Sequence, residues 1–297
     1  MDITASLVKE LRDKTGAGMM DCKRALVETS GDIDLAMLWL REKGIAKAQK
    51  KASRIAAEGV CNIKIEADKA IMFELNCETD FVAKNDKFQA LADQIGDAIL
   101  NADVNSVEEA LKIEINGKSI ENLILETISN IGENINLRRL NVTMKDASQI
   151  YGHYIHMGGK IASLAVINGG DFETAKDIAM QVAASNPQYL QASDISETFI
   201  AGEREILTKE ALNENAESEK PKPEAIIHKM VEGRLQKNLK EICLVNQPFI
   251  KNPDQQVGEY VKAKGATIAL FQRMAVGEGI EKKEDNFAEE VMSQAKL

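Results

Sequence analysis

The positions of the prolines constrain most tightly how this chain can fold. All five lie after residue 186, at Pro187, Pro221, Pro223, Pro248 and Pro253. Proline breaks helices and removes a backbone donor from a sheet, so the first 186 residues lack the strongest breaker of regular structure. Glycines must therefore divide that stretch into elements. The period of the hydrophobic residues between those glycines then indicates which element each one is.

The first 54 residues predict three short helices. Thr4 caps the first helix and Gly16 ends it, while Asp32 caps the third, which we expect to end at Gly44. Three helices of this size bury little surface, so the module is expected to dock on something larger. It carries 11 Lys and Arg against 8 Asp and Glu and runs into a basic linker. A solvated connector and a basic contact surface for an acidic partner both fit this composition.

After Gly59 the hydrophobic period changes to the period of two that is typical of strands. Alternating apolar residues predict a β-hairpin with one buried face, and helical spacing then predicts two helices before a third strand. The ranges are 61–77 for the hairpin, 88–99 and 120–131 for the helices, and 140–144 for the strand. This order predicts an α+β subdomain in which helices cover an antiparallel sheet.

A weaker copy of the same order begins at Tyr151, with a hairpin over 151–167, a helix over 174–185 and a late strand over 266–274. Two helices joined by a polar tip interrupt this copy and predict an inserted helical hairpin. The predicted parts are a helical module with a basic linker at 1–54, a first α+β subdomain at 55–145, a second at 146–187 and 229–275, the inserted hairpin at 188–228, and a C-terminal helical module at 276–297.

Composition excludes several classes of function. The net charge is −10 and aromatic residues are 4% of the 297 residues, which argues against a protein that binds nucleic acid by base stacking and phosphate neutralisation. The alternative hypothesis is a scaffold protein that binds nucleic acid through its basic first module. No apolar run approaches the roughly 20 residues that span a bilayer, and no secretory signal is visible. We expect a cytoplasmic protein without a membrane partner.

No catalytic, metal or cofactor site emerges from the motifs. Gly158-Gly159-Lys160 lacks the first glycine of a phosphate-binding loop. His153 and His156 lie three apart on a predicted strand, so they point to opposite faces and make a poor metal site. Cys61 and Cys77 are expected to face each other across the first hairpin as core thiols. We expect no enzyme activity, no metal and no cofactor.

The stretch from Glu78 to Val82 allows two interpretations. Structurally, Thr79 or Asp80 would cap a helix and Phe81 would be a hydrophobic staple. Functionally, a carboxylate and an exposed aromatic residue would stand together at a loop tip, suited to wedging into a partner.

Several long motifs make the chain resemble bacterial translation elongation factor Ts. They are TASLVKELRDKTGAGMMDCKRAL near the start, NCETDFVAKND at 76–86, KMVEGRL at 229–235 with QPFI at 247–250, and VGEGIEKKEDNFAEEV at 276–291. They follow one another in order over nearly the whole length. The resemblance implies an α+β fold with a three-helix, UBA-like N-terminal module, two related subdomains of antiparallel sheet with helices, an inserted helical hairpin and a C-terminal helix.

The same resemblance implies a guanine-nucleotide exchange factor that binds elongation factor Tu in its GDP-bound and nucleotide-free forms. In this family the motif matched by Thr79, Asp80, Phe81 and Val82 disturbs the Mg²⁺ site of the partner, so that GDP leaves and GTP can bind. The hairpin is a candidate for self-association, as a homodimer or within a heterotetramer. Further contacts implied by the matching motifs are Arg12, Met19, Met20, His156, Met157, Gly158 and Phe287.

Overall fold

The structure is a computed structural model that describes residues 3–218 and 220–281. Its described residues combine helices with antiparallel sheets, which confirms the predicted α+β class. They divide into two compact units. The first comprises the described residues within Met1–Thr143, Met157–Lys160 and Met274–Leu297, and the second comprises Met144–His156 and Ile161–Arg273. The predicted division into five parts is finer than this and stays a prediction.

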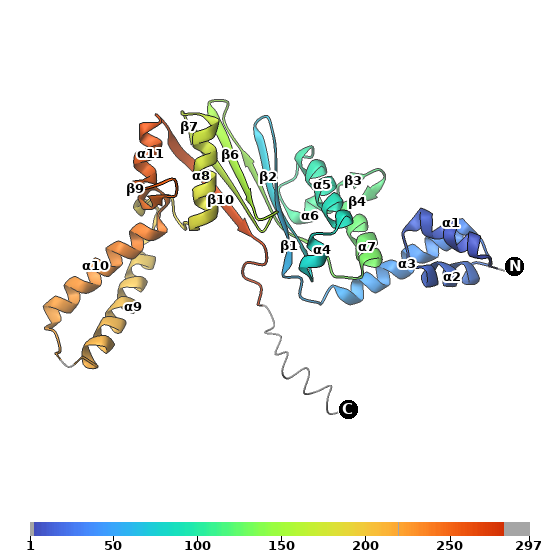
Figure 1. The fold of residues 1–297 in the computed structure, drawn as a ribbon, viewed down its shortest axis with the longest axis horizontal. Helices are drawn as coiled ribbons and strands as arrows, with labels where there is room; N and C mark the ends of the chain where they lie inside the picture. The colour runs from blue at the N-terminus through green and yellow to red at the C-terminus, as the bar shows by residue number, and fades with distance from the viewer. Residues whose placement is uncertain (1–2, 219, 282–297) are drawn as a thin grey trace. The chain divides into compact units, whose positions relative to one another are not determined.

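The first unit begins with the three expected helices, α1 (Ala5–Thr15), α2 (Met19–Glu28) and α3 (Ile33–Lys51) (Figure 1). The backbone N–H of Leu7 donates to Thr4 Oγ1 at 3.3 Å and that of Leu35 donates to Asp32 Oδ1 at 2.9 Å, so both predicted caps are confirmed. The predicted end of α3 at Gly44 is wrong, because α3 continues to Lys51. A Cβ at Gly44 would lie 2.7 Å from Ser129 Oγ, so this glycine allows close packing and does not end the helix.

The sheet of the first unit has the strand order β1-β2-β5, with β1 (Glu58–Glu66), β2 (Lys69–Cys77) and β5 (Asn136–Met144). Two amphipathic helices, α5 (Asp86–Leu100) and α7 (Ile120–Ile131), lie beside it (Figure 1) and share its apolar core, in which Phe73 and Phe88 are fully buried. The shorter elements are α4 (Asp80–Ala83), α6 (Val107–Ala110), β3 (Glu114–Ile115) and β4 (Lys118–Ser119).

Strand β2 is buried on both faces, not on the single face that its alternation predicted. It is the middle strand of its sheet, and its second face carries the polar side chains of Glu74 and Asn76. The Glu74 carboxylate accepts hydrogen bonds from Arg138, from Arg139 and, at 2.7 Å, from the backbone N–H of Gly277. Alternation predicts that polar residues on this face are solvated, whereas Glu74 is buried here among charged partners and the Asn76 amide donates to it.

The pairing register of the first hairpin also corrects the expectation for its cysteines. Cys61 lies opposite Glu74 and Cys77 lies opposite Glu58, so the two cysteines do not face each other. Both cysteines are buried, as expected for core thiols.

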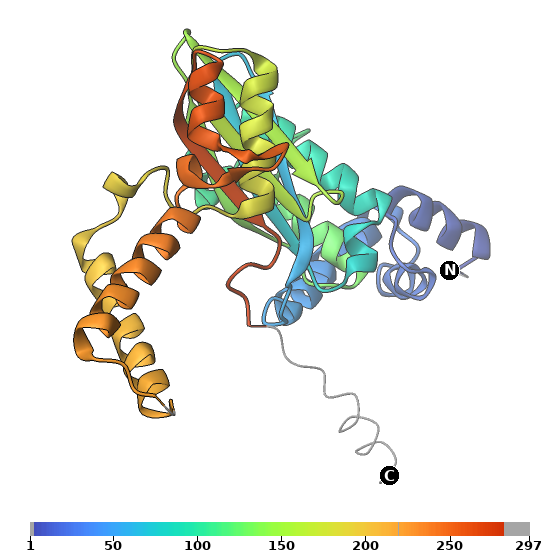
Figure 2. The same ribbon diagram turned by 60° about the vertical axis from the view of Figure 1, so that its left-hand side comes forward.

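The sheet of the second unit has the strand order β10-β7-β6, from β6 (Gln149–His156), β7 (Ile161–Asn168) and β10 (Thr267–Ala275). Helix α8 (Phe172–Ser185) lies across β6 and β7 (Figure 2). In both units the third strand joins the second strand of a hairpin, so the two sheets share the strand order that the repeated sequence pattern predicts. The remaining small elements are η1 (Ala192–Asp194), η2 (Leu244–Asn246), β8 (Pro248–Phe249), β9 (Asn252–Gln256) and α11 (Val257–Ala263).

The inserted helical hairpin consists of α9 (Glu197–Ala216) and α10 (Glu224–Ile242), which Figure 2 shows as two neighbouring arms. The arms bury a thin apolar stripe of their own, centred on Leu207, Val231 and Leu235. Ion pairs join them on the outside, for example Arg234 with Glu214 at 2.8 Å. The stripe therefore pairs the two arms with each other.

Candidate partner-binding site

The residues Thr79 to Val82 form a short helix directly after the central strand. β2 ends at Cys77, and Thr79 adopts an extended conformation with φ −124° and ψ 156° before α4 starts at Asp80. The backbone N–H of Val82 donates to Thr79 Oγ1 at 3.3 Å, so Thr79 is the N-cap of α4. The structural interpretation of this stretch is therefore right about the cap.

That interpretation is wrong about Phe81. A hydrophobic staple is packed against its own helix, whereas the Phe81 side chain is 83% exposed. Its neighbours anchor the helix instead, since Ala83 is buried and Val82 packs against the core of the first unit. The fold thus holds an aromatic ring in solvent on an anchored turn of backbone.

Asp80 lies beside this ring on the same turn. Its carboxylate accepts a hydrogen bond from Lys84 Nζ at 2.8 Å, and this bond, supported by the positive charge of Lys84, lowers the pKa of Asp80. Asp80 is consequently ionised at neutral pH. A partner that bound this carboxylate would have to compete with Lys84, an exposed side chain.

Cys77 joins the end of β2 to the same loop. Its thiol donates to the carbonyl oxygen of Thr79 at 3.2 Å. Burial raises the pKa of Cys77 to about 12, so at neutral pH the sulfur keeps the proton that this bond requires. The thiol therefore helps to fix the loop.

Glu133 is the residue at this site to which the sequence patterns did not point. It follows α7 and its carboxylate accepts three hydrogen bonds from the start of the loop, from the backbone N–H groups of Glu78 and Thr79 and from the Thr79 hydroxyl. The only signal in the sequence is its place after Gly132, where the helical period stops. A carboxylate after a helix is usually solvated, so that signal is weak.

The other predicted contact residues lie elsewhere. Arg12, Met19 and Met20 are exposed on the helical module, Met20 with 70% of its surface accessible. These exposed methionines contrast with Leu11, which is buried in the core of that module. Phe287 lies outside the described residues, as does most of the predicted C-terminal module.

The turn after β6 carries the remaining predicted contacts. His156 is exposed at the end of β6, with its Nδ1 atom 3.2 Å from the Tyr154 hydroxyl. Met157 is 74% exposed and has a positive φ of 49°, a conformation that side chains rarely adopt. Gly159 attaches the turn to β1, because its carbonyl oxygen accepts from the Cys61 backbone N–H at 2.7 Å.

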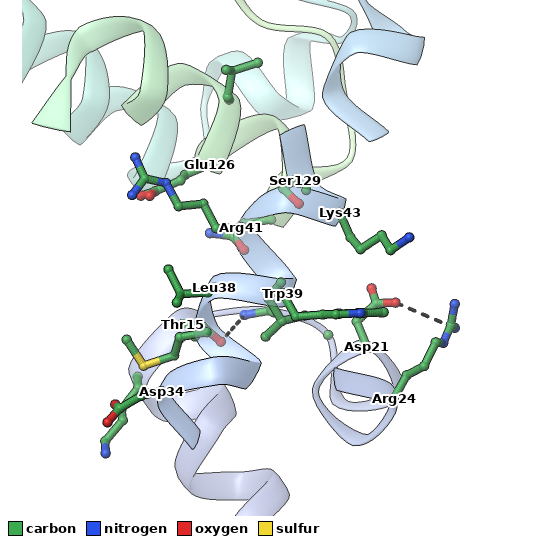
Figure 3. A pocket seen from close by; sticks show the side chains of 18 of the residues that line it. Thr15, Asp21, Arg24, Asp34, Leu38, Trp39, Arg41, Lys43, Glu126 and Ser129 are labelled. Carbon is green, nitrogen blue, oxygen red and sulfur yellow. Dashed lines mark hydrogen bonds and ion pairs between the residues drawn. The ribbon is translucent and has the colours of Figure 1, made fainter. Parts of the chain in front are cut away.

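A cavity of about 630 Å³ lies between the helical module and α7 (Figure 3). Its volume is in the range of small-molecule sites, and Trp39 contributes an aromatic wall. Its charged side chains do not converge, however. Figure 3 shows Arg41 and Lys43 pointing in opposite directions, and Arg24 is paired with Asp21 at 3.7 Å. This arrangement does not define a ligand.

Among the residues that the structure describes, no helix has the length and apolar character needed to cross a membrane. The same described ranges contain no cluster of three or more potential metal ligands. In a comparison with protein families, the family model described as "Elongation factor TS" matches residues 78–278, about two thirds of the chain. The match starts at Glu78, so it includes α4 and the loop that carries it.

Proposed function

Because the chain belongs to the elongation factor Ts family, we propose that it is the guanine-nucleotide exchange factor for elongation factor Tu in translation. It binds the GDP form of that partner, disturbs the Mg²⁺ site and promotes the release of GDP. The exposure of Phe81 on an anchored helix is the observation that supports this proposal most directly.

The physical basis is the dependence of nucleotide affinity on Mg²⁺. The ion bridges phosphate oxygens and protein ligands, so moving those ligands weakens the binding of the nucleotide. In the proposed mechanism Phe81 enters the partner as a wedge, and its ring leaves water for an apolar site. Asp80 gives up its hydrogen bond with Lys84 and accepts hydrogen bonds from the partner groups that Phe81 displaces.

Exchange further requires that the factor bind the nucleotide-free partner more tightly than the GDP form. Equal affinity for both forms would shift no equilibrium, however tight the binding. The proposed factor makes and breaks no covalent bond, so it is no enzyme and needs no cofactor or metal of its own. We place it in the cytoplasm, with its partner.

The other contacts belong to the same proposal. The exposed Arg12, Met19 and Met20 offer a mixed basic and apolar surface for the nucleotide-binding domain of the partner. The turn at His156, Met157 and Gly158 offers a second contact with another domain. Self-association through α9 and α10 stays a prediction, which sedimentation of the free chain would test.

The release of labelled GDP tests the function. A fluorescent GDP analogue is loaded on purified elongation factor Tu, and its dissociation is followed by stopped flow with increasing amounts of this protein and excess unlabelled GDP. We expect the observed rate to rise with factor concentration and to saturate. A rate that stays at the intrinsic value across the titration contradicts the proposal.

A further inference from the structure

We propose that Glu133 is a positioning residue for nucleotide exchange: it fixes the backbone at Glu78 and Thr79 so that α4 presents Asp80 and Phe81 in one orientation. This role rests on the proposed function and deepens it. Glu133 itself need not touch the partner, because it acts through the loop that it holds.

The contacts of Glu133 are specific in distance and in donor type. Its Oε2 atom accepts from the backbone N–H of Glu78 at 3.1 Å and from that of Thr79 at 3.0 Å. Its Oε1 atom accepts from the Thr79 hydroxyl at 2.7 Å. One side chain therefore holds both the backbone before α4 and the residue that caps it.

The loop also accepts a hydrogen bond from the segment that follows α7, so two segments far apart in sequence hold each other in place. The carboxylate of Glu78 accepts from the backbone N–H of Asn134 at 2.6 Å. The side-chain amide of Asn134 donates to the carbonyl oxygen of Arg54 at 2.8 Å, which ties the same corner to the segment after α3. The corner therefore joins the end of β2 to the segments that follow α7 and α3.

Glu133 is itself held by the way in which α7 ends. Gly132 takes the left-handed conformation with φ 95°, and its N–H donates to the carbonyl oxygen of Ile128 at 2.8 Å. Lys51 Nζ donates to the Gly132 carbonyl oxygen at 2.6 Å. The chain thus turns at Gly132 and places Glu133 against the loop before β5 begins at Asn136.

Positioning matters here because α4 has only four residues. A helix of one turn does not form by its own hydrogen bonds, so its orientation depends on its anchors. The packing of Val82 and Ala83 is one anchor, and Glu133 is the other. A wedge already held in its bound orientation avoids the entropic cost of ordering upon binding.

Three substitutions at Glu133 separate geometry from charge. In Glu133→Gln the amide oxygen can still accept from both backbone N–H groups, and the amide nitrogen can donate to the Thr79 hydroxyl. Glu133→Asp keeps the charge but is one methylene too short to reach, and Glu133→Ala removes every contact. We expect Glu133→Gln to accelerate GDP release within about threefold of the wild type, and the other two to lose about tenfold.

Hydrogen–deuterium exchange measures directly whether Glu133 still holds the backbone of the loop. The backbone amides of Glu78 and Thr79 should exchange faster in Glu133→Asp and Glu133→Ala than in Glu133→Gln, while those of β2 should be unchanged. Glu114→Ala, at an exposed position in the same unit, is the matched control and should behave as the wild type in both assays. If Glu133→Ala does not fold, the comparison of Gln with Asp decides alone.

The outcomes separate this role from the function on which it rests. An active wild type with equally active variants overturns the role of Glu133 only. A Glu133→Asp variant more active than Glu133→Gln overturns positioning in favour of a direct effect of charge. A wild type that leaves GDP release unchanged overturns the proposed function, and the role of Glu133 with it.

Discussion

Phe81 and Phe88 lie seven residues apart and have opposite environments. Phe88 is fully buried in the core of the first unit, whereas Phe81 is 83% exposed. Exposing a ring of this size forgoes about 1.5–3 kcal/mol of hydrophobic stabilisation relative to burial. Single exposed apolar residues are common on proteins. This ring differs in lying on a helix whose cap, packing and Glu133 contacts all fix its place.

Phe81→Ala should separate activity from stability. The substitution removes the proposed wedge, so the acceleration of GDP release should fall by about 2 kcal/mol in transition-state terms, or roughly 30-fold, as for a residue that dominates an interface. The free energy of unfolding should change by less than about 0.5 kcal/mol, because the ring contributes little to the core. Stopped-flow release and urea denaturation measure the two quantities.

Phe88→Ala is the matched control, because it removes the same ring from a buried position. It should lower the free energy of unfolding by about 3–5 kcal/mol. If Phe81→Ala loses a comparable amount of stability, the ring is structural after all. If its GDP release equals that of the wild type, Phe81 is not the wedge.

One part of this site, the helix cap, can be predicted from the sequence, and the reason is physical. Caps depend on local backbone geometry, so Thr79 is recognisable from its neighbours alone. Exposure of Phe81 and contact with Glu133 depend on which segments meet in space, across 54 residues of chain. Periodicity carries no information about such a contact, and a carboxylate at the end of a helix looks the same whether it is solvated or bonded.

At the level of secondary-structure elements, the central strand β2 shows the same limit of prediction from the sequence. Its apolar positions were predicted, and Phe73 and Leu75 are in the core. Alternation predicts that the opposite face, which carries Glu74 and Asn76, is solvated. Burial of Glu74 is possible only because β5 brings Arg138 and Arg139 to it and the chain after β10 brings the N–H of Gly277. These partners come from distant sequence, so alternation alone could not predict them.

Glu74→Gln tests how strongly this carboxylate joins the three segments. Breaking a buried pair leaves the arginines without their carboxylate, so the free energy of unfolding at pH 7 should fall by about 3 kcal/mol. Glu214→Gln, which breaks the exposed pair with Arg234 in the helical hairpin, is the control and should cost less than about 1 kcal/mol. Urea denaturation of the three proteins measures both effects.

The effect of Glu74→Gln should also depend on pH. Burial by itself raises the pKa of Glu74, but donors from Gly277, Asn76 and Arg139 outweigh it and hold the pKa below its ordinary value of 4.5. The folded state therefore favours the ionised carboxylate, and its stabilisation is complete above pH 4.5 and is lost as the pH falls through the lowered pKa. The difference between wild type and variant should be constant from pH 7 to 5 and shrink below 4.5. A difference that grows toward low pH contradicts the assignment.

On the scale of the whole molecule, charge is distributed unevenly. The chain has a net charge of −10, yet its first 54 residues carry more Lys and Arg than Asp and Glu. A basic, partly apolar surface on the helical module suits a first encounter with an acidic partner, since complementary charge mainly raises the rate of association. An overall negative chain is a poor ligand for nucleic acid, whose backbone it would repel.

At the level of the whole molecule, the sharpest test of exchange is the coupling between two binding events on elongation factor Tu, that of this protein and that of GDP. If the factor weakens GDP binding, GDP must weaken binding of the factor by the same ratio, because both effects are one coupling free energy. Full-length protein and nucleotide-free elongation factor Tu should therefore co-elute in size exclusion and separate as GDP is added. With Phe81→Ala the complex should be weaker without nucleotide and less sensitive to GDP, because the wedge carries the coupling. Glu114→Ala should retain the wild-type response. A complex that persists at saturating GDP would identify a passive binder of elongation factor Tu and exclude the exchange mechanism.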